Sequence, residues 1–134
     1  MSATAGASRR AAAAGALFGF FGVAAGAFGA HALKAQLDPG ALSVFDTAVR
    51  YHLVHALALF ASAWVAREWP GRSASASAIF FGLGIVLFSG SLYALSLTGM
   101  HFLGALTPVG GVLLLLGWLA LALAAYGGAR DARA

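Results

Sequence analysis

The chain has 134 residues, of which 61% are hydrophobic and only 9% are charged, and its formal net charge is +4. A water-soluble domain carries roughly 25% charged residues, so this composition excludes an ordinary soluble protein. The absence of cysteine excludes disulfides, thiolate nucleophiles and cysteine-based metal sites, and the basic residues are too scattered to bind nucleic acid.

Four apolar stretches fill most of the chain, and each has about the ~20 residues that a helix needs to cross a bilayer core. They are residues 11–33, 49–66, 75–97 and 108–126. Four spans leave no room for a second domain, so residues 1–134 are predicted to form one all-α polytopic membrane domain, a bundle of four transmembrane helices. The first stretch exceeds the ~7–15 residues of a signal-peptide core, so we expect it to remain as a span.

The first stretch carries a stripe of glycines. The spacing alternates between four and three residues, which keeps all of them on one side of a helix. Small residues let helices approach closely in a membrane, where burial from water cannot drive association. Packing within the chain is the favoured interpretation, and a homo-oligomer interface is the alternative. The glycines are Gly15, Gly19, Gly22, Gly26 and Gly29.

The second stretch is preceded by a helix-start signal, Asp38–Pro39, which combines an N-cap residue with proline at the first helical position. The helix is therefore expected to begin near Pro39, with residues 39–48 lying on the outer membrane surface before the span itself.

The third and fourth stretches carry further packing signals. Helical periodicity places Gly82 of the third stretch on one face with several hydroxyl-bearing residues, whose side chains can bond to other helices. Thr107–Pro108 predicts the start of the fourth helix. Gly110 and Gly111 follow, and they indicate close packing of this helix start, with anion binding as the alternative.

The distribution of charge predicts the orientation. Only Lys34 and Arg50 fall on one side of the membrane. The positive-inside rule therefore places both termini in the cytoplasm, on the side with the other basic residues. These are Arg9, Arg10, Arg67, Arg72, Arg130 and Arg133.

Most polar side chains within the spans fall at one depth, in the half of the bundle nearer the outer side. Ionisable residues inside a membrane usually face a bundle interior or a wet cavity, so this cluster is the candidate ligand site. Its members are His31, Tyr51, His52, His55, Ser89, Ser91, Tyr93 and Thr107.

The histidines of this cluster allow three interpretations. His52 and His55 are three residues apart on one helical face, so they can hold a metal or haem with His31 as the third ligand. A proton relay is the second interpretation, and hydrogen bonding between helices by neutral histidines is the third and favoured one. If the first span stays helical to its end, His31 points away from the glycine stripe and does not join the others.

Several segments together resemble the transmembrane protein 256 family, or domain of unknown function 423, which includes small bacterial inner-membrane proteins of the YgdD and YwdK kind. The resemblance implies a four-span membrane protein without an assigned reaction, and it supplies no catalytic or ligand residues. The family pattern tends to have other residues at the position of His52, which argues against a two-histidine metal site. The segments are Gly26–His31, Tyr51–Leu59, Leu87–Tyr93, Thr107–Gly111 and Gly117–Trp118.

The sequence thus favours a non-enzymatic structural or accessory protein of the inner membrane, without a cofactor. Its expected partners are the lipid bilayer and other membrane proteins or a second copy of itself. The alternative is a binding or transport module for a small molecule, a metal or haem, with a polar pocket in the outer half of the bundle.

Overall fold

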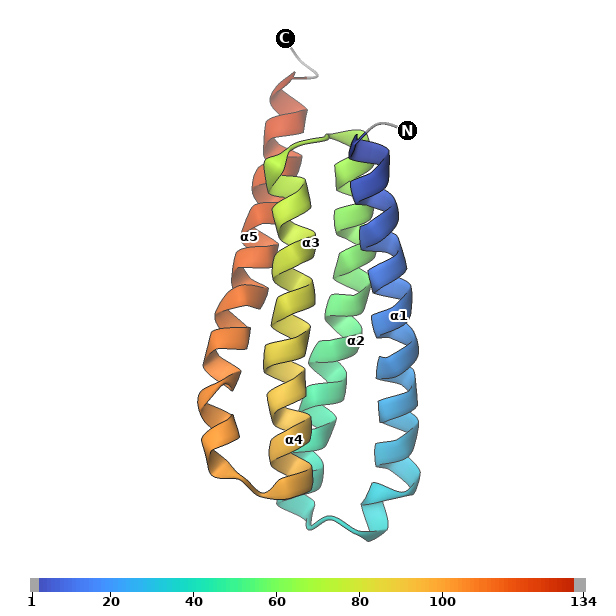
Figure 1. Ribbon diagram of the computed structural model, residues 1–134, viewed down its shortest axis with the longest axis vertical. Helices are drawn as coiled ribbons and strands as arrows, with labels where there is room; N and C mark the ends of the chain where they lie inside the picture. The colour runs from blue at the N-terminus through green and yellow to red at the C-terminus, as the bar shows by residue number, and fades with distance from the viewer. Residues whose placement is uncertain (1–2, 132–134) are drawn as a thin grey trace.

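The computed structural model describes residues 3–131 and is helical over nearly all of them. Two 3-10 turns, η1 (Leu33–Ala35) and η3 (His101–Ala105), join the rods at one end. The helices form four rods, each long and apolar enough to cross a membrane (Figure 1). The third rod is continuous but contains a π-helical segment, η2 (Ile85–Ser89). In chain order the helices are α1 (Ala3–His31), α2 (Pro39–Glu68), α3 (Arg72–Gly84), η2 (Ile85–Ser89), α4 (Gly90–Thr98) and α5 (Thr107–Asp131).

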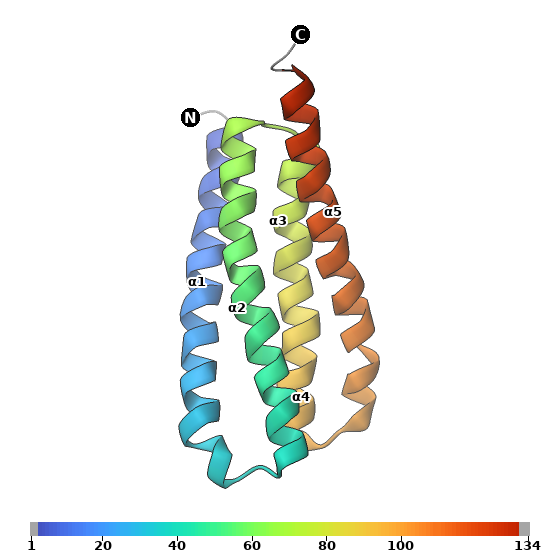
Figure 2. The same ribbon diagram turned by 180° about the vertical axis from the view of Figure 1, so that it is seen from behind.

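Two rods form the centre of the bundle, and the other two flank it. Helix α2 packs along the rod of α3, η2 and α4, while α1 packs almost entirely on α2, and α5 packs mainly on α3 and η2. Helices α1 and α5 therefore lie on opposite sides (Figures 1 and 2). We call the end that holds both termini the terminal end, and the end with η1 and η3 the distal end.

Helix α2 begins where the capping signal predicts. The Asp38 carboxylate accepts hydrogen bonds from the backbone N–H groups of Gly40 and Ala41, at 2.9 and 3.1 Å. Residues 39–48 are the first turns of this unbroken helix, and Phe45 among them is buried inside the bundle. Their place on the outer membrane surface stays a prediction.

The glycine stripe of α1 forms the seam with α2. A β-carbon at Gly15 would lie 3.0 Å from the Ala56 carbonyl oxygen, and one at Gly29 would lie 2.9 Å from the ring of Phe45. Gly19 differs, because a β-carbon there would meet nothing within 4 Å. The seam therefore belongs to packing within the chain, and the glycines that face α2 are Gly15, Gly22, Gly26 and Gly29.

Replacing Gly15 with leucine should push α1 away from α2 and lower the free energy of unfolding by about 2 kcal/mol, since overpacking displaces a rigid main chain. The measurement is equilibrium unfolding in mixed micelles, followed by circular dichroism. The matched control is Gly19→Leu, which has open space and should change stability by less than about 0.5 kcal/mol. Equal losses in the two variants would contradict this account of the seam.

The π-helical segment changes which way the third rod faces. It inserts an extra residue into the helical turn, so the residues after it are rotated relative to those before it. Gly82 accordingly faces Phe18 of α1, whereas Ser89 bonds to the backbone of α2. The single polar face that regular periodicity predicts for this span is therefore divided between two neighbours.

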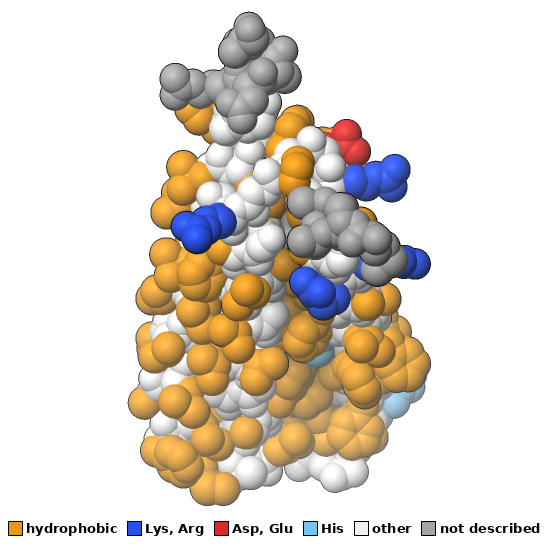
Figure 3. All heavy atoms as spheres, turned by 45° about the horizontal axis from the view of Figure 1, so that its top comes forward, with side chains coloured by type: hydrophobic (Ala, Val, Ile, Leu, Met, Phe, Trp, Pro, Cys, Tyr) orange, Lys and Arg blue, Asp and Glu red, His pale blue; other side chains and the backbone are white. Residues whose placement is uncertain are grey.

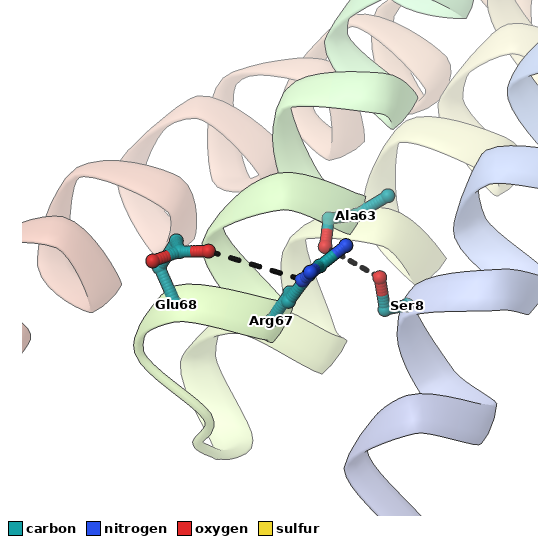
Figure 4. A network of polar contacts seen from close by, with 4 residues as sticks. All are labelled: Ser8, Ala63, Arg67 and Glu68. Atoms are coloured by element: carbon teal, nitrogen blue, oxygen red, sulfur yellow. Dashed lines mark hydrogen bonds and ion pairs between the residues drawn. The ribbon is translucent and has the colours of Figure 1, made fainter.

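Hydroxyl groups link the rods at the terminal end. The Ser8 hydroxyl donates to the Ala63 carbonyl at 2.8 Å, which joins α1 to α2 (Figure 4). Deeper in the bundle, Ser77 donates to the hydroxyl of Ser62 at 2.9 Å, with both side chains fully buried. Such bonds hold helices together in a membrane, where the hydrophobic effect does not drive helices to associate.

Candidate functional site

His31 does not join the other two histidines. Helix α1 continues through this residue, and the exposed side chain bonds through Nδ1 to the Ala27 carbonyl of its own helix, at 2.9 Å. This is the geometry expected for a span that stays helical to its end. Within residues 3–131, no group of three or more histidine, aspartate or glutamate side chains lies close enough to hold a metal.

His52 connects three helices. It is buried, its Nδ1 lies 3.1 Å from the Tyr93 hydroxyl of α4 in a hydrogen bond, and its ring meets Phe18 of α1 edge-on. Gly22 permits this approach, because a β-carbon there would lie 3.4 Å from the imidazole. The Nε2 atom is buried and has no hydrogen-bond partner among the described residues, although the Phe18 backbone lies beside the ring.

His55 uses both ring nitrogens in hydrogen bonds. A carbonyl oxygen can only accept, so Nδ1 donates to the Tyr51 carbonyl, at 2.7 Å. Nε2 accepts from the indole N–H of Trp118 on α5, at 3.1 Å. The two bonds select the neutral imidazole with its proton on Nδ1. This histidine therefore has no lone pair left for a metal.

The hydroxyl groups of the cluster also bond within the protein. Ser89 donates to the Ala48 carbonyl of α2 at 2.8 Å, and Ser91 and Thr107 share a hydrogen bond of 2.8 Å between α4 and α5. The sequence-predicted cluster is therefore divided into separate links between pairs of helices. Trp118 completes one of them; the predicted cluster did not include it, although it belongs to the Gly117–Trp118 segment of the family resemblance.

A groove lies beside this cluster, between α2 and α5. Its volume is about 500 Å³, and its lining is mostly apolar. Tyr51, His55 and Trp118 form its aromatic side, together with Phe88 of η2. The rings of Tyr51 and Phe88 meet at a tilt of 38°, with 4.5 Å between their centroids, and Tyr51 is 42% exposed.

The hydrogen bond between His55 and Trp118 should contribute about 1 kcal/mol to stability. We expect a double-mutant cycle with His55→Ala and Trp118→Phe to give a coupling free energy of that size, measured by unfolding in mixed micelles. The control cycle pairs His55→Ala with Trp64→Phe at the terminal end of α2, and its coupling should be near zero. Independent effects of His55 and Trp118 would rule out the bond.

The fold and these contacts define a small polytopic membrane protein whose internal polar groups join its four helical rods. The family described as "Protein of unknown function (DUF423)" matches residues 25–111, and the chain belongs to this family. The predicted class, an all-α membrane protein with four apolar helices, is thereby confirmed, as is the resemblance on which it partly rested.

Several curated relatives are similar over most of their length. UPF0382 membrane protein YwdK of Bacillus subtilis (strain 168) is 44% identical over 83% of this chain and 91% of its own length. A UPF0382 membrane protein of Haemophilus influenzae is 43% identical, with 83% and 89% covered. UPF0382 inner membrane protein YgdD of Escherichia coli (strain K12) is 40% identical, with 77% and 79% covered. No solved structure matches this chain significantly.

Proposed function

We propose that this chain is a non-enzymatic structural or accessory protein of the inner membrane, which acts through contacts with other membrane components. One observation carries the proposal: His52, His55, Ser89 and Ser91 each bond to a neighbouring helix, so most of the polar side chains of the candidate site are engaged within the protein. Bonds of this kind hold a membrane bundle together, whereas a catalytic site needs groups that are free to meet a substrate.

The flanking helices supply the surface for such contacts. Helix α1 touches little besides α2, and large apolar side chains of its outer face are exposed, such as Phe20 and Val23. Helix α5 exposes Leu115 and Leu119 on the opposite flank. Lipid covers these faces in a monomer, and apolar faces of other membrane proteins, or of a second copy, fit them equally well.

Co-purification tests the proposal. The full chain with an affinity tag is cross-linked in native membranes, solubilised in mild detergent and analysed by mass spectrometry. We expect a defined set of membrane proteins, or a dimer of the chain, that is lost when Phe20 and Val23 are changed to alanine. Recovery only as a free monomer from cross-linked membranes would contradict the proposal.

We also infer that both termini lie in the cytoplasm. Arg9, Arg10, Arg67 and Arg72 belong to the terminal end, where the basic side chains gather in Figure 3, whereas Lys34 and Arg50 lie toward the distal end. The side chain of Arg130 and the whole of Arg133, which complete the predicted basic set, lie outside the described residues. The asymmetry supports a cytoplasmic terminal end by the positive-inside rule.

The absence of cysteine makes this orientation easy to test. Single variants Lys34→Cys and Arg67→Cys are treated in intact cells with a maleimide that does not cross membranes. We expect labelling of Lys34→Cys in intact cells and of Arg67→Cys only after the membrane is opened. The reverse pattern would invert the topology.

The groove between α2 and α5 favours a second candidate function, the binding of a small apolar molecule. Mass spectrometry of small molecules that co-purify with the protein in mild detergent, beside a His55→Ala variant of the groove lining, tests it. An apolar molecule that is lost in the variant would promote binding over the accessory role. The same bound molecules with reduced stability of the variant would support a packing role for His55.

A further inference from the structure

A second groove runs between α1 and α3 at the terminal end. These two helices scarcely touch, because both pack on α2, and two adjoining cavities of about 250 and 460 Å³ lie between them. Leu59 and Ala66 of α2 form the floor, and small side chains such as Ala7 and Ser75 form the walls. The groove is open toward the surrounding bilayer, since Ile79 on its rim is 61% exposed.

Two arginines from different helices border this groove. Arg10 of α1 lines the first cavity, and Arg72, the first residue of α3, lines the second. Neither cavity is lined by a carboxylate. Among the described side chains, the one carboxylate of this end is Glu68, which lies 4.0 Å from Arg67 in an exposed pair. Arg10 and Arg72 therefore present uncompensated positive charge at the mouth of an apolar groove.

We propose that the groove between α1 and α3 binds an anionic phospholipid, with its headgroup phosphate at Arg10 and Arg72 and the start of an acyl chain between the helices. A phosphate suits two arginines, because guanidinium donors match its oxygen atoms and its negative charge offsets theirs. The apolar floor suits a chain of methylene groups, which a free phosphate does not provide.

The position of the groove within the bilayer agrees with this occupant. On α1 the lining runs from Ala7 to Ala14, a rise of about 10 Å, which begins among the basic residues of the terminal end and enters the apolar span. Basic pockets between transmembrane helices on the cytoplasmic side are sites where anionic lipid headgroups bind. The occupant thus spans the boundary between the interface and the hydrocarbon core.

Lipid retention in native mass spectrometry tests the proposal. The full chain in mild detergent is titrated with phosphatidylglycerol or with phosphatidylcholine of the same acyl chains. We expect one phosphatidylglycerol to bind preferentially, and Arg10→Gln with Arg72→Gln to weaken its binding about 30-fold, since each basic residue near an anionic surface contributes roughly fivefold. Binding of phosphatidylcholine should change much less.

The matched control removes the same amount of charge from residues outside the groove. Arg9→Gln with Arg67→Gln removes the same two charges at the same end, but neither residue lines the groove. We expect this control to weaken phosphatidylglycerol binding less than threefold. An equal loss in both double variants would overturn the proposal, because it would assign the binding to the net charge of this end. A wild-type chain without preference for the anionic lipid would also overturn it.

A separate substitution tests whether the apolar part of the groove binds the acyl chain of the lipid. Ser75 lines both cavities, is exposed, and makes no side-chain hydrogen bond that its replacement would break. Ser75→Leu should fill the groove and weaken the binding of phosphatidylglycerol about tenfold, whereas Ser75→Ala should leave this binding unchanged. If Ser75→Leu has no effect while excess inorganic phosphate displaces the lipid, the site recognises phosphate alone and the proposal fails.

Discussion

Replacing Phe81 with alanine should lower the free energy of unfolding by about 3 kcal/mol, the largest loss that we expect from a single truncation in this chain. Phe81 has no exposed surface, and its ring lies 5.1 Å from that of Trp118 and 5.7 Å from that of His55, between centroids. Truncation leaves a cavity between α2, α3 and α5 that their backbones cannot close. The measurement is equilibrium unfolding in mixed micelles, followed by tryptophan fluorescence and circular dichroism.

The control is the same substitution on the lipid-facing surface. Phe20 of α1 is 68% exposed, so its side chain contacts lipid in both the folded and the unfolded protein. Phe20→Ala should therefore lower the free energy of unfolding by less than about 0.5 kcal/mol. A small effect at Phe81 would mean that the three helices are not packed around this ring. A double change of Phe81 and Trp118 should cost less than the sum, because the two rings share one contact.

Replacing Gly110 with alanine should also destabilise the protein, by about 2–3 kcal/mol. A β-carbon there would lie 2.7 Å from Cα of Phe88 and 2.8 Å from the carbonyl carbon of Leu87, in the backbone of η2. A main chain cannot rotate out of the way as a side chain does, so α5 has to move away from the π-helical segment. The measurement is the same unfolding experiment.

The neighbouring glycine supplies a control with the opposite sign. A β-carbon at Gly111 would lie 3.7 Å from the ring of Phe88, an ordinary contact. Gly111→Ala should therefore be neutral or stabilise by about 0.5 kcal/mol, since alanine favours a helix over glycine. If alanine at Gly110 and alanine at Gly111 are both tolerated, α5 does not approach η2 as closely as described.

The helix starts show which features of the fold can be predicted from short segments of the sequence. Asp38–Pro39 and Thr107–Pro108 predict the first residues of α2 and α5, because capping depends on neighbours in the chain. The glycine spacing likewise predicts a close seam on α1. It does not say that Gly19 is left out of that seam, since this depends on the angle at which α1 crosses α2.

The polar cluster shows what counting along the chain can predict and what it cannot. Depth follows from counting residues along antiparallel spans, which places His52, His55 and Tyr93 at one level. Their partners depend on how each helix is rotated about its axis, and the π-helical segment changes that rotation in the third rod. Pairs of residues therefore link separate helices and do not line the single pocket that the alternative interpretation describes.

The sequence by itself determined that this is a membrane protein with four long apolar helices, and where two of those helices begin, because composition, length and capping are local properties of the chain. Only the tertiary structure decided that α1 and α5 flank a central pair, that His55 is engaged at both nitrogens, and that an arginine-bordered groove opens between α1 and α3. Those features arise from contacts between residues distant in the chain, and small differences in helix rotation select among them.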